Sequence, residues 1–561
     1  ITQQLYKGLS ITGMFSFDTY NYTSNRFTKS PNTYHATGRD ANGNLIYEQT
    51  RQGTENLAYS LSAKGVRTIY LEAALNYKNT FGRHDVSGML LFNQSDEINT
   101  KATNVEEALP YRFRGLAGRF TYGFDDRYFA EFNFGYNGSE NFTPKNRYGF
   151  FPSVGLGWVI SNESFFEPLT NVIQYLKVRG TWGQVGNSQI SGRRFAYLAT
   201  VTDSSSTSYT FGKNMDQNYG TTAIDEYAVD VTWEVADKTD IGVDMRLLNN
   251  KLNLQFDYFK ESREGIYLRR SSIPSYVGMI NNPYGNIGKV ENKGFELSVN
   301  YANSWGGDWS LSLMGNYSFN RNKVLEDDST VVYPWQNTIG NKVGQRFGLV
   351  ALGLFESYGE IAASPVQTGD TRPGDIKYKD INGDGKIDEY DKVPIGWGSV
   401  PEIMYGFGFS VGWKNLSLTA MFQGAAHVDA MLSGEGVLPF SQGSSRGNLL
   451  SNITDRWTEE NPRQNAFYPR LSIGNINMNY EESTWWLKDT DYLRLKNIEL
   501  SYRLPDHWMK RIHLDNARIF IQGVNLLTFS SFKIWDVELG DGRGARYPNI
   551  ASVSLGVNFN F

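Results

Sequence analysis

Polar and apolar side chains alternate strictly at the end of the chain, from Ser552 to Phe561. The apolar members are Val553, Leu555, Val557, Phe559 and Phe561. Successive side chains of a β-strand point to opposite faces, so this stretch predicts a strand with one apolar and one polar face. Such a strand suits the wall of an outer-membrane β-barrel, which meets lipid on one side and water on the other. A closing strand that ends in Phe is typical of these barrels.

The same two-residue period recurs along the chain. Residues 127–138, 252–260 and 405–413 are among the clearest examples, with Phe132, Phe256 and Phe407 on their apolar sides. Short turns such as Asp125-Asp126 alternate with long polar connections such as 187–230, 321–401 and 423–483. Roughly sixteen strands result, which predicts an all-β fold: a transmembrane antiparallel barrel with short periplasmic turns, long outer loops and aromatic girdles.

Composition agrees with this interpretation. Aromatic residues make up 14% of the chain and glycine occurs 56 times, while the mean hydropathy is −0.45. No stretch is long and apolar enough to predict a membrane-spanning helix. The net charge of −5 argues against a nucleic-acid partner. The absence of cysteine excludes disulfides and thiolate chemistry.

Several stretches resemble the SusC/RagA family of TonB-linked outer-membrane nutrient transporters. They are residues 176–187, 373–388, 401–424 and 492–529, together with the terminal Phe561. The resemblance implies an N-terminal plug domain inside a barrel of about 22 strands. We therefore expect residues 1–561 to be the C-terminal part of the barrel, with an extracellular insertion at 321–401. The plug, the TonB-contacting segment and about six strands would lie outside this chain.

The resemblance also implies partners and a location. It implies the bacterial outer membrane, a SusD-like lipoprotein lid over the outer loops, TonB acting through the N-terminal part, and surrounding lipid. The cargo would be oligosaccharides or oligopeptides, and the sequence leaves both open. No catalytic constellation is visible, so we expect no enzymatic activity.

Residues 380–391 have the spacing of a twelve-residue calcium loop. The ligand positions would be Asp380, Asn382, Asp384, the Lys386 carbonyl, Asp388 and Asp391. Calcium is a hard cation that binds clustered oxygen atoms, and this loop supplies them. The last position is Asp rather than the longer Glu. The alternative is a hairpin tip rich in Asx turns that needs no ion.

Aromatic residues in the outer loops are candidates for contact with substrate. Tyr333, Trp335, Trp397 and Trp457 could stack on sugar rings or on peptide side chains. The alternatives are packing between loops, an interfacial girdle or the lid interface. Trp485 and Trp486 stand just before a strand, and we expect them in the girdle.

The alternative functions are a passive porin and a non-transporting scaffold or adhesin. The visible strands could in principle close into a pore by themselves, although the loops at 321–401 and 423–483 are long for a porin. A scaffold would use these loops to hold partner proteins. An outer-membrane hydrolase is less well supported, because the sequence shows no catalytic constellation.

Overall fold

The computed structural model describes residues 1–102, 105–190, 193–440, 449–474, 476–511 and 514–560. The terminal Phe561 therefore lies outside the described residues. Strands dominate, and the α-helices are short: α1 (Val105–Ala108), α2 (Tyr358–Ala362) and α3 (Asp506–Arg511). Among the described residues, none of the helices has the length and apolar character that crossing a membrane requires. The chain forms two compact units, which are described separately below.

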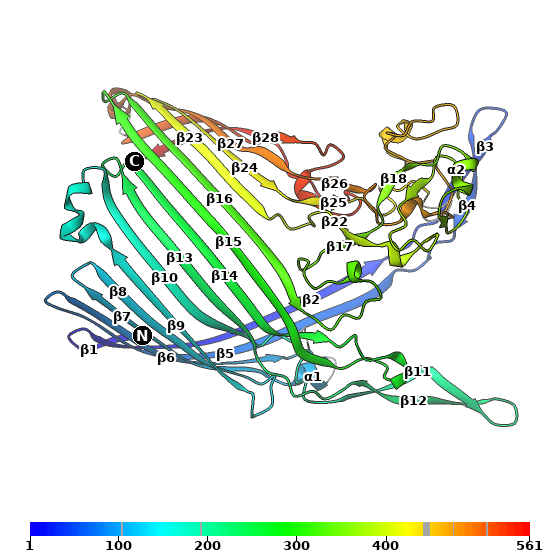
Figure 1. Ribbon diagram of the computed structural model, residues 1–561, viewed down its shortest axis with the longest axis horizontal. Helices are drawn as coiled ribbons and strands as arrows, with labels where there is room; N and C mark the ends of the chain where they lie inside the picture. Colours follow the sequence, from blue (N-terminus) through cyan, green and yellow to red (C-terminus); the bar gives the residue numbers. More distant parts are fainter. Residues whose placement is uncertain (103–104, 191–192, 441–448, 475, 512–513, 561) are drawn as a thin grey trace. The chain divides into compact units, whose positions relative to one another are not determined.

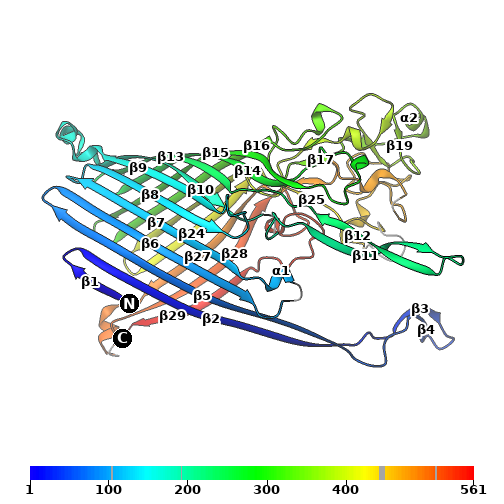
Figure 2. The same ribbon diagram turned by 90° about the horizontal axis from the view of Figure 1, so that it is seen from below.

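The first unit contains residues 1–122, 132–151 and 188–197. Four strands pair antiparallel in it, each with the next one named: β1 (Thr2–Tyr6), β2 (Leu9–Thr28), β5 (Ala58–Phe81) and β6 (His84–Asn99). The strands β7 (Tyr111–Phe124) and β8 (Tyr128–Ser139) follow in the chain. Figure 2 shows β2 and β5 side by side, with the hairpin of β3 (Thr33–Arg39) and β4 (Leu45–Arg51) beyond their ends.

Apart from residues 148–151, the second unit contains a ladder of eleven described strands, here called the second sheet (Figure 1). Each strand pairs antiparallel with the next. In chain order they are β9 (Tyr148–Val159), β10 (Ile173–Asn187), β13 (Glu234–Leu247), β14 (Leu252–Arg269), β15 (Tyr284–Trp305), β16 (Trp309–Glu326), β23 (Ile403–Trp413), β24 (Leu416–Ala426), β27 (Tyr492–Arg503), β28 (Asn516–Ser530) and β29 (Ser552–Asn560).

The two ladders together with β7 and β8 give seventeen described strands, close to the roughly sixteen predicted. The predicted turn at Asp125 and Asp126 is present, with φ of 54° and 52°. Positive φ at both central residues is the signature of a type I′ hairpin turn. The connection 187–230, predicted as a loop, also contains the hairpin of β11 (Thr200–Phe211) and β12 (Gln217–Glu226).

The pairing register of the second sheet sorts its side chains into two faces. Phe256 lies opposite Leu297, which lies opposite Tyr317. Residues directly opposite each other share a face, so this row defines the apolar face of the second sheet. Phe256 and Phe407 are 42% and 44% exposed, so neither is buried in a protein core.

The other side is the polar face of the second sheet. Here Arg179 forms ion pairs with Asp257 and, at 2.9 Å, with Asp240. Gly242 lies between Arg179 and Asp257 in the register, and a Cβ there would come within 2.4 Å of the guanidinium. The glycine therefore allows the ion pair to cross its strand. The two-residue alternation predicted from the sequence is confirmed.

Three connections of the second unit fold together into what we call the loop body, whose described residues are 327–402, 427–440, 449–474, 476–491 and 531–551. Figure 1 shows its short strands gathered at one end of β16, β23 and β24. These short strands are β17 (Arg346–Gly348), β18 (Ala351–Leu354), β19 (Val366–Gln367), β20 (Ile376–Tyr378), β21 (Lys386–Ile387), β22 (Val393–Ile395), β25 (Asp429–Met431) and β26 (Leu487–Asp489). Leu349, Tyr468 and Trp486 belong to one hydrophobic cluster that draws on separate connections. The insertion was predicted at 321–401, but residues 321–326 still belong to β16, and the remainder is part of a larger packed body.

Candidate functional site

Tyr333 and Trp335 pack against the predicted calcium loop. Their rings stack at a centroid distance of 4.6 Å and an interplanar angle of 10°. The Trp335 indole N–H donates to the backbone carbonyl of Tyr390 at 2.8 Å, and the Tyr390 ring meets Tyr333 edge-on at 5.6 Å. The turn at Pro334–Gln336 therefore lies beside residues 389–391, and both aromatic candidates remain partly exposed.

The predicted calcium loop is closed by hydrogen bonds from its own backbone. Asp380 accepts from the N–H groups of Gly383 and Gly385 at 2.7 and 2.9 Å. Gly385 has a φ of 82°, which permits the sharp turn predicted for it. Asp384 accepts from the Lys386 N–H at 2.9 Å and from the Asn382 amide at 3.1 Å.

The chemistry of the donor set fits calcium, because carboxylate, amide and carbonyl oxygens are the ligands of a hard cation. Asp391, the twelfth position, is fully buried and accepts from the N–H groups of Ile381 and Asp388 at 2.7 and 2.9 Å. Asp388 caps the same turn by accepting from the Tyr390 N–H. Across the described ranges, no three or more acidic or imidazole side chains converge as a metal centre. The loop thus holds its shape through internal hydrogen bonds.

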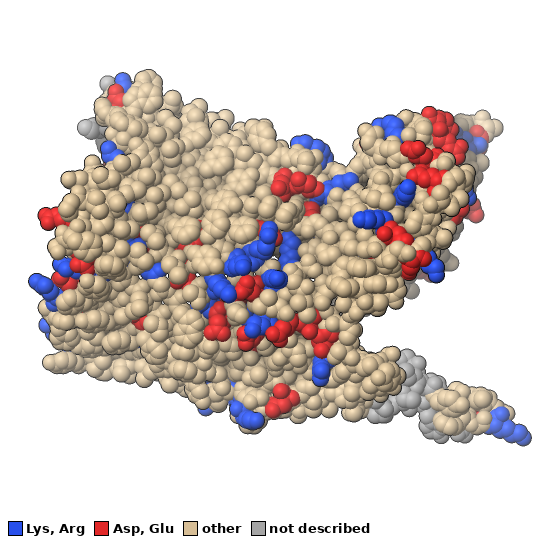
Figure 3. Space-filling view, viewed as in Figure 1, with Lys and Arg blue, Asp and Glu red and all other residues tan. Residues whose placement is uncertain are grey.

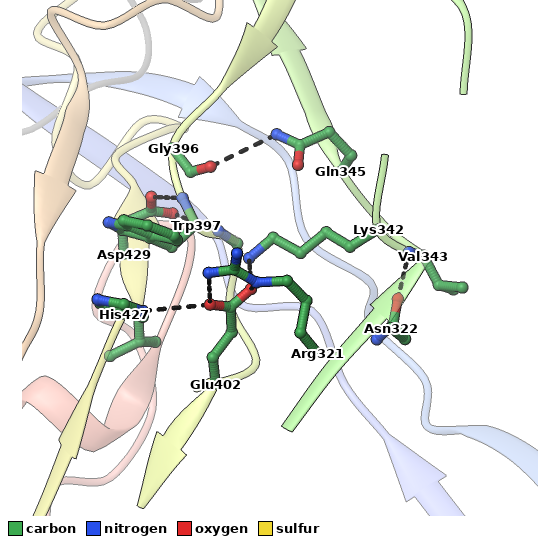
Figure 4. A network of polar contacts seen from close by, with 12 residues as sticks. Arg321, Asn322, Lys342, Val343, Gln345, Gly396, Trp397, Glu402, His427 and Asp429 are labelled. Carbon is green, nitrogen blue, oxygen red and sulfur yellow. Dashed lines mark hydrogen bonds and ion pairs between the residues drawn. The ribbon is translucent and has the colours of Figure 1, made fainter. Parts of the chain in front are cut away.

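Trp397 lies in a polar network where β16 and β23 meet the loop body (Figure 4). Its ring stacks on His427 at 4.0 Å with an angle of 4°. Glu402 accepts from Arg321 at 2.7 Å, from Lys342 at 3.2 Å and pairs with His427 at 3.1 Å. The Lys342 ammonium and the Arg321 guanidinium lie 5.4 and 5.8 Å from the Trp397 ring. Trp397 is 42% exposed as a whole residue, and its ring therefore lies beside two cations as well as His427.

Two carboxylates in this network respond to burial in different ways. Burial raises the pKa of Glu402, but hydrogen bonds from Arg321, His427 and Lys342 outweigh burial and hold that pKa below its ordinary value. For Asp429, burial outweighs the backbone N–H groups of Trp397 and Gly398, and the pKa is raised.

Trp457 is only 5% exposed and belongs to the hydrophobic cluster of the loop body. Gly374, with a φ of 87°, lies against its ring, and a Cβ there would approach within 2.2 Å. This tryptophan offers little surface to a ligand. Trp486 is 1% exposed in the same cluster, so its predicted place in a girdle is wrong. The four aromatic candidates occupy three different environments.

The sequence analysis missed a buried polar network around Asp375, which is 1% exposed. Arg470 donates two hydrogen bonds of 2.9 Å to it, and Asn477 and Asn479 donate at 3.1 and 2.9 Å. These partners are about a hundred residues away in the sequence. No local spacing could have indicated them.

A family model described as "TonB dependent receptor-like, beta-barrel" matches residues 3–526. The chain belongs to this family. Membership agrees with the two faces of the second sheet: an apolar face for lipid and a polar face for the aqueous interior. The predicted barrel class and the outer-membrane location are confirmed.

The resemblance to SusC/RagA is also confirmed. TonB-dependent receptor P3 of Formosa agariphila is 27% identical over 585 residues, covering 99% of this chain and 54% of that protein. TonB-dependent receptor SusC of Bacteroides thetaiotaomicron is 27% identical over 462 residues, covering 79% and 43%. The chain thus spans about half the length of the curated relatives that it matches. These relatives are named as receptors, in agreement with the expectation that the chain is not an enzyme.

A solved structure titled "Structure of the RagAB peptide transporter" shares the fold. The TM-score is 0.73 at 20% sequence identity, and the match covers all of this chain and 61% of that one. At this identity the match supports the fold.

Proposed function

We propose that this chain forms the C-terminal part of a transporter that imports large nutrients across the outer membrane in a TonB-dependent manner. The observation that carries the proposal is membership of the receptor family. The two-faced second sheet supports it, because a continuous polar face gives a hydrated path for a large solute. The N-terminal plug and the first strands belong to the remaining half of such a protein.

The proposed cargo is an oligosaccharide or an oligopeptide. The relative named SusC and the structure titled a peptide transporter represent the two classes. Among the aromatic candidates, Tyr333 and Trp335 are partly exposed and Trp397 is exposed, and these three are the ones proposed to contact the cargo. Trp457 would act only by holding the loop body together.

The proposed partner is a SusD-like lipoprotein that covers the loop body. What supports this is the packing of the loop body, since a passive pore needs no loops with their own hydrophobic core. A rigid platform costs a partner less conformational entropy on binding than mobile loops would. TonB would act through the N-terminal part.

Uptake by whole cells tests the proposal. A deletion strain would be supplied with fluorescent oligosaccharides and oligopeptides, with the full-length gene restored on a plasmid. We expect uptake of one cargo class to be lost, to return on complementation, and to stop when an uncoupler dissipates the proton-motive force. Uptake that persists with the uncoupler, together with a stably open conductance in planar bilayers, would establish the porin. Stable partner proteins without an uptake defect would establish the scaffold.

We further propose that residues 380–391 bind calcium as a structural ion. The spacing and oxygen donors support it, together with the turn at Gly385. Thermal unfolding of the full-length protein would be followed while Ca²⁺ is titrated, with an Asp384→Ala variant beside it. We expect Ca²⁺ to raise the unfolding temperature of the parent and not of the variant. An equal response in both would remove calcium from the account.

A further inference from the structure

A row of cations crosses three strands on the apolar face of the second sheet. Lys260 on β14 lies directly opposite Lys293 on β15, and Lys293 lies opposite Arg321 on β16. Adjacent strands are about 4.8 Å apart, so the row spans about 10 Å. Like charges in direct register repel each other. An anion bound beside the row would reduce this repulsion.

The aromatic residues beside this row indicate its position relative to the apolar band of the barrel. One step closer to the middle of the strands, Tyr258 lies opposite Phe295, which lies opposite Phe319. At the far end of the same face, Trp305, Trp309 and Trp413 form a second aromatic row in register. From Trp309 to Phe319 the strand rises about 33 Å. With a tilt of roughly 40°, this covers about 25 Å, the height of the apolar band of an outer-membrane barrel.

The cation row thus begins where the apolar band ends. Its end of the strands carries the long connections, whereas Gly306-Gly307 and Lys414-Asn415 turn tightly at the other end. The end with long connections faces the cell exterior. The row therefore stands at the headgroup level of the outer leaflet.

Nearby carboxylates offset only part of this charge. Lys260 and Lys293 share Glu291, at 2.8 and 3.6 Å, and Lys323 lies opposite Glu291 in the register. The side chains of Lys260 and Lys293 are 51% and 58% exposed, whereas Glu291 is 20% exposed. Arg321 is 49% exposed and its partner Glu402 only 6%. The cations are therefore the accessible members of these pairs. Figure 3 shows Lys and Arg beside Asp and Glu over this part of β14–β16, next to a broad uncharged surface.

We propose that this row binds the phosphate group of an outer-leaflet lipid. The apolar band below it receives the acyl chains, and the three cations above it meet the headgroup. A basic residue near a membrane surface contributes about 1 kcal/mol of attraction to an anionic lipid, which is about fivefold in affinity. This inference goes beyond the transport of nutrients, since it concerns the anchoring of the wall in its own membrane.

The test uses the full-length protein in detergent micelles and native mass spectrometry. The probes are phosphatidic acid, which carries a phosphate monoester, and zwitterionic phosphatidylcholine. We expect the parent to retain phosphatidic acid preferentially. The variant carrying Lys260→Gln and Lys293→Gln should lose about 25-fold in affinity for it, about fivefold for each lysine. Lys238→Gln is the matched control, because Lys238 is 52% exposed but pairs with Glu261 on the polar face; it should bind as the parent does.

A second variant acts in the opposite direction, so that misfolding cannot imitate the result. Glu291→Gln removes the carboxylate shared by Lys260 and Lys293 and should raise the affinity for phosphatidic acid about fivefold. Equal retention of the two lipids by the parent would overturn the proposal, as would unchanged binding by the lysine variant or an equal loss with Lys238→Gln. Displacement of phosphatidic acid by millimolar inorganic phosphate would assign the row to a free anion and also overturn it.

Discussion

The second sheet and the loop body solve the problem of polar groups in different ways. In the sheet, the backbone pairs along antiparallel ladders, and side chains are sorted by register onto two faces. In the loop body, side chains from distant segments pack into one hydrophobic cluster, to which Trp457 and Trp486 belong. Buried charges such as Asp375 form ion pairs with residues far away in the sequence, here Arg470. The stability of the sheet depends on lipid at one face and water at the other, whereas the stability of the loop body depends on its own hydrophobic core.

The largest effect is expected where a buried charge loses its partner in the loop body. Asp375→Ala would remove the buried carboxylate that accepts from Arg470 and from two asparagine amides, at a cost of about 3–5 kcal/mol. We expect limited proteolysis to cleave the loop body of the variant while the strands of the second sheet stay protected. Asp370→Asn is the control, because its side chain is 45% exposed and pairs at the surface with Arg372. Equal protease resistance of Asp375→Ala and the parent would contradict the comparison.

A smaller effect is expected from placing a charge on the apolar face. Leu297 and Ser298 are neighbours on β15 that point to opposite faces. Leu297→Lys puts a charge inside the apolar band, one step from its outer aromatic row, which costs about 1–2 kcal/mol, whereas Ser298→Lys stays in water. Urea unfolding in phospholipid vesicles would measure both. If the two faces of the sheet were equivalent, both variants would lose the same free energy of unfolding.

The smallest effect is expected at the junction of the two regions, where solvent screens part of the network. The pKa of Glu402 is held below its ordinary value of 4.5, so its contribution is present above pH 4.5 and is lost as pH falls through the lowered value. Asp429 has a raised pKa, and its contribution has the opposite sign: it weakens as pH rises through that value.

The pH dependence of thermal unfolding, followed by tryptophan fluorescence, separates the two carboxylates. Glu402→Gln should remove the loss of stability below pH 4.5, because Gln does not titrate and binds Arg321 and Lys342 more weakly at every pH. A variant that keeps the acid transition of the parent would assign that transition to other carboxylates.

The strands could be predicted because their information is local. The alternation around Phe256 and the two aspartates of the 125–126 turn each indicate their structure within a few residues, since period and turn geometry are properties of short segments. The residues that could contact substrate were harder to predict from the sequence. Trp397 and Trp457 look alike in the sequence, yet one is 42% and the other 5% exposed. The same holds for Trp486, whose position before a strand suggested a girdle.

The sequence by itself determined which residues face lipid and which face water in the wall, because a period of two fixes the side of every residue once the strand is known. The tertiary structure alone decided how the long connections pack, which tryptophans they bury, and that Asp375 meets Arg470. Such contacts join segments far apart in the chain, so no local pattern encodes them. The same is true of the cation row, because Lys260, Lys293 and Arg321 become neighbours only through the register of three strands.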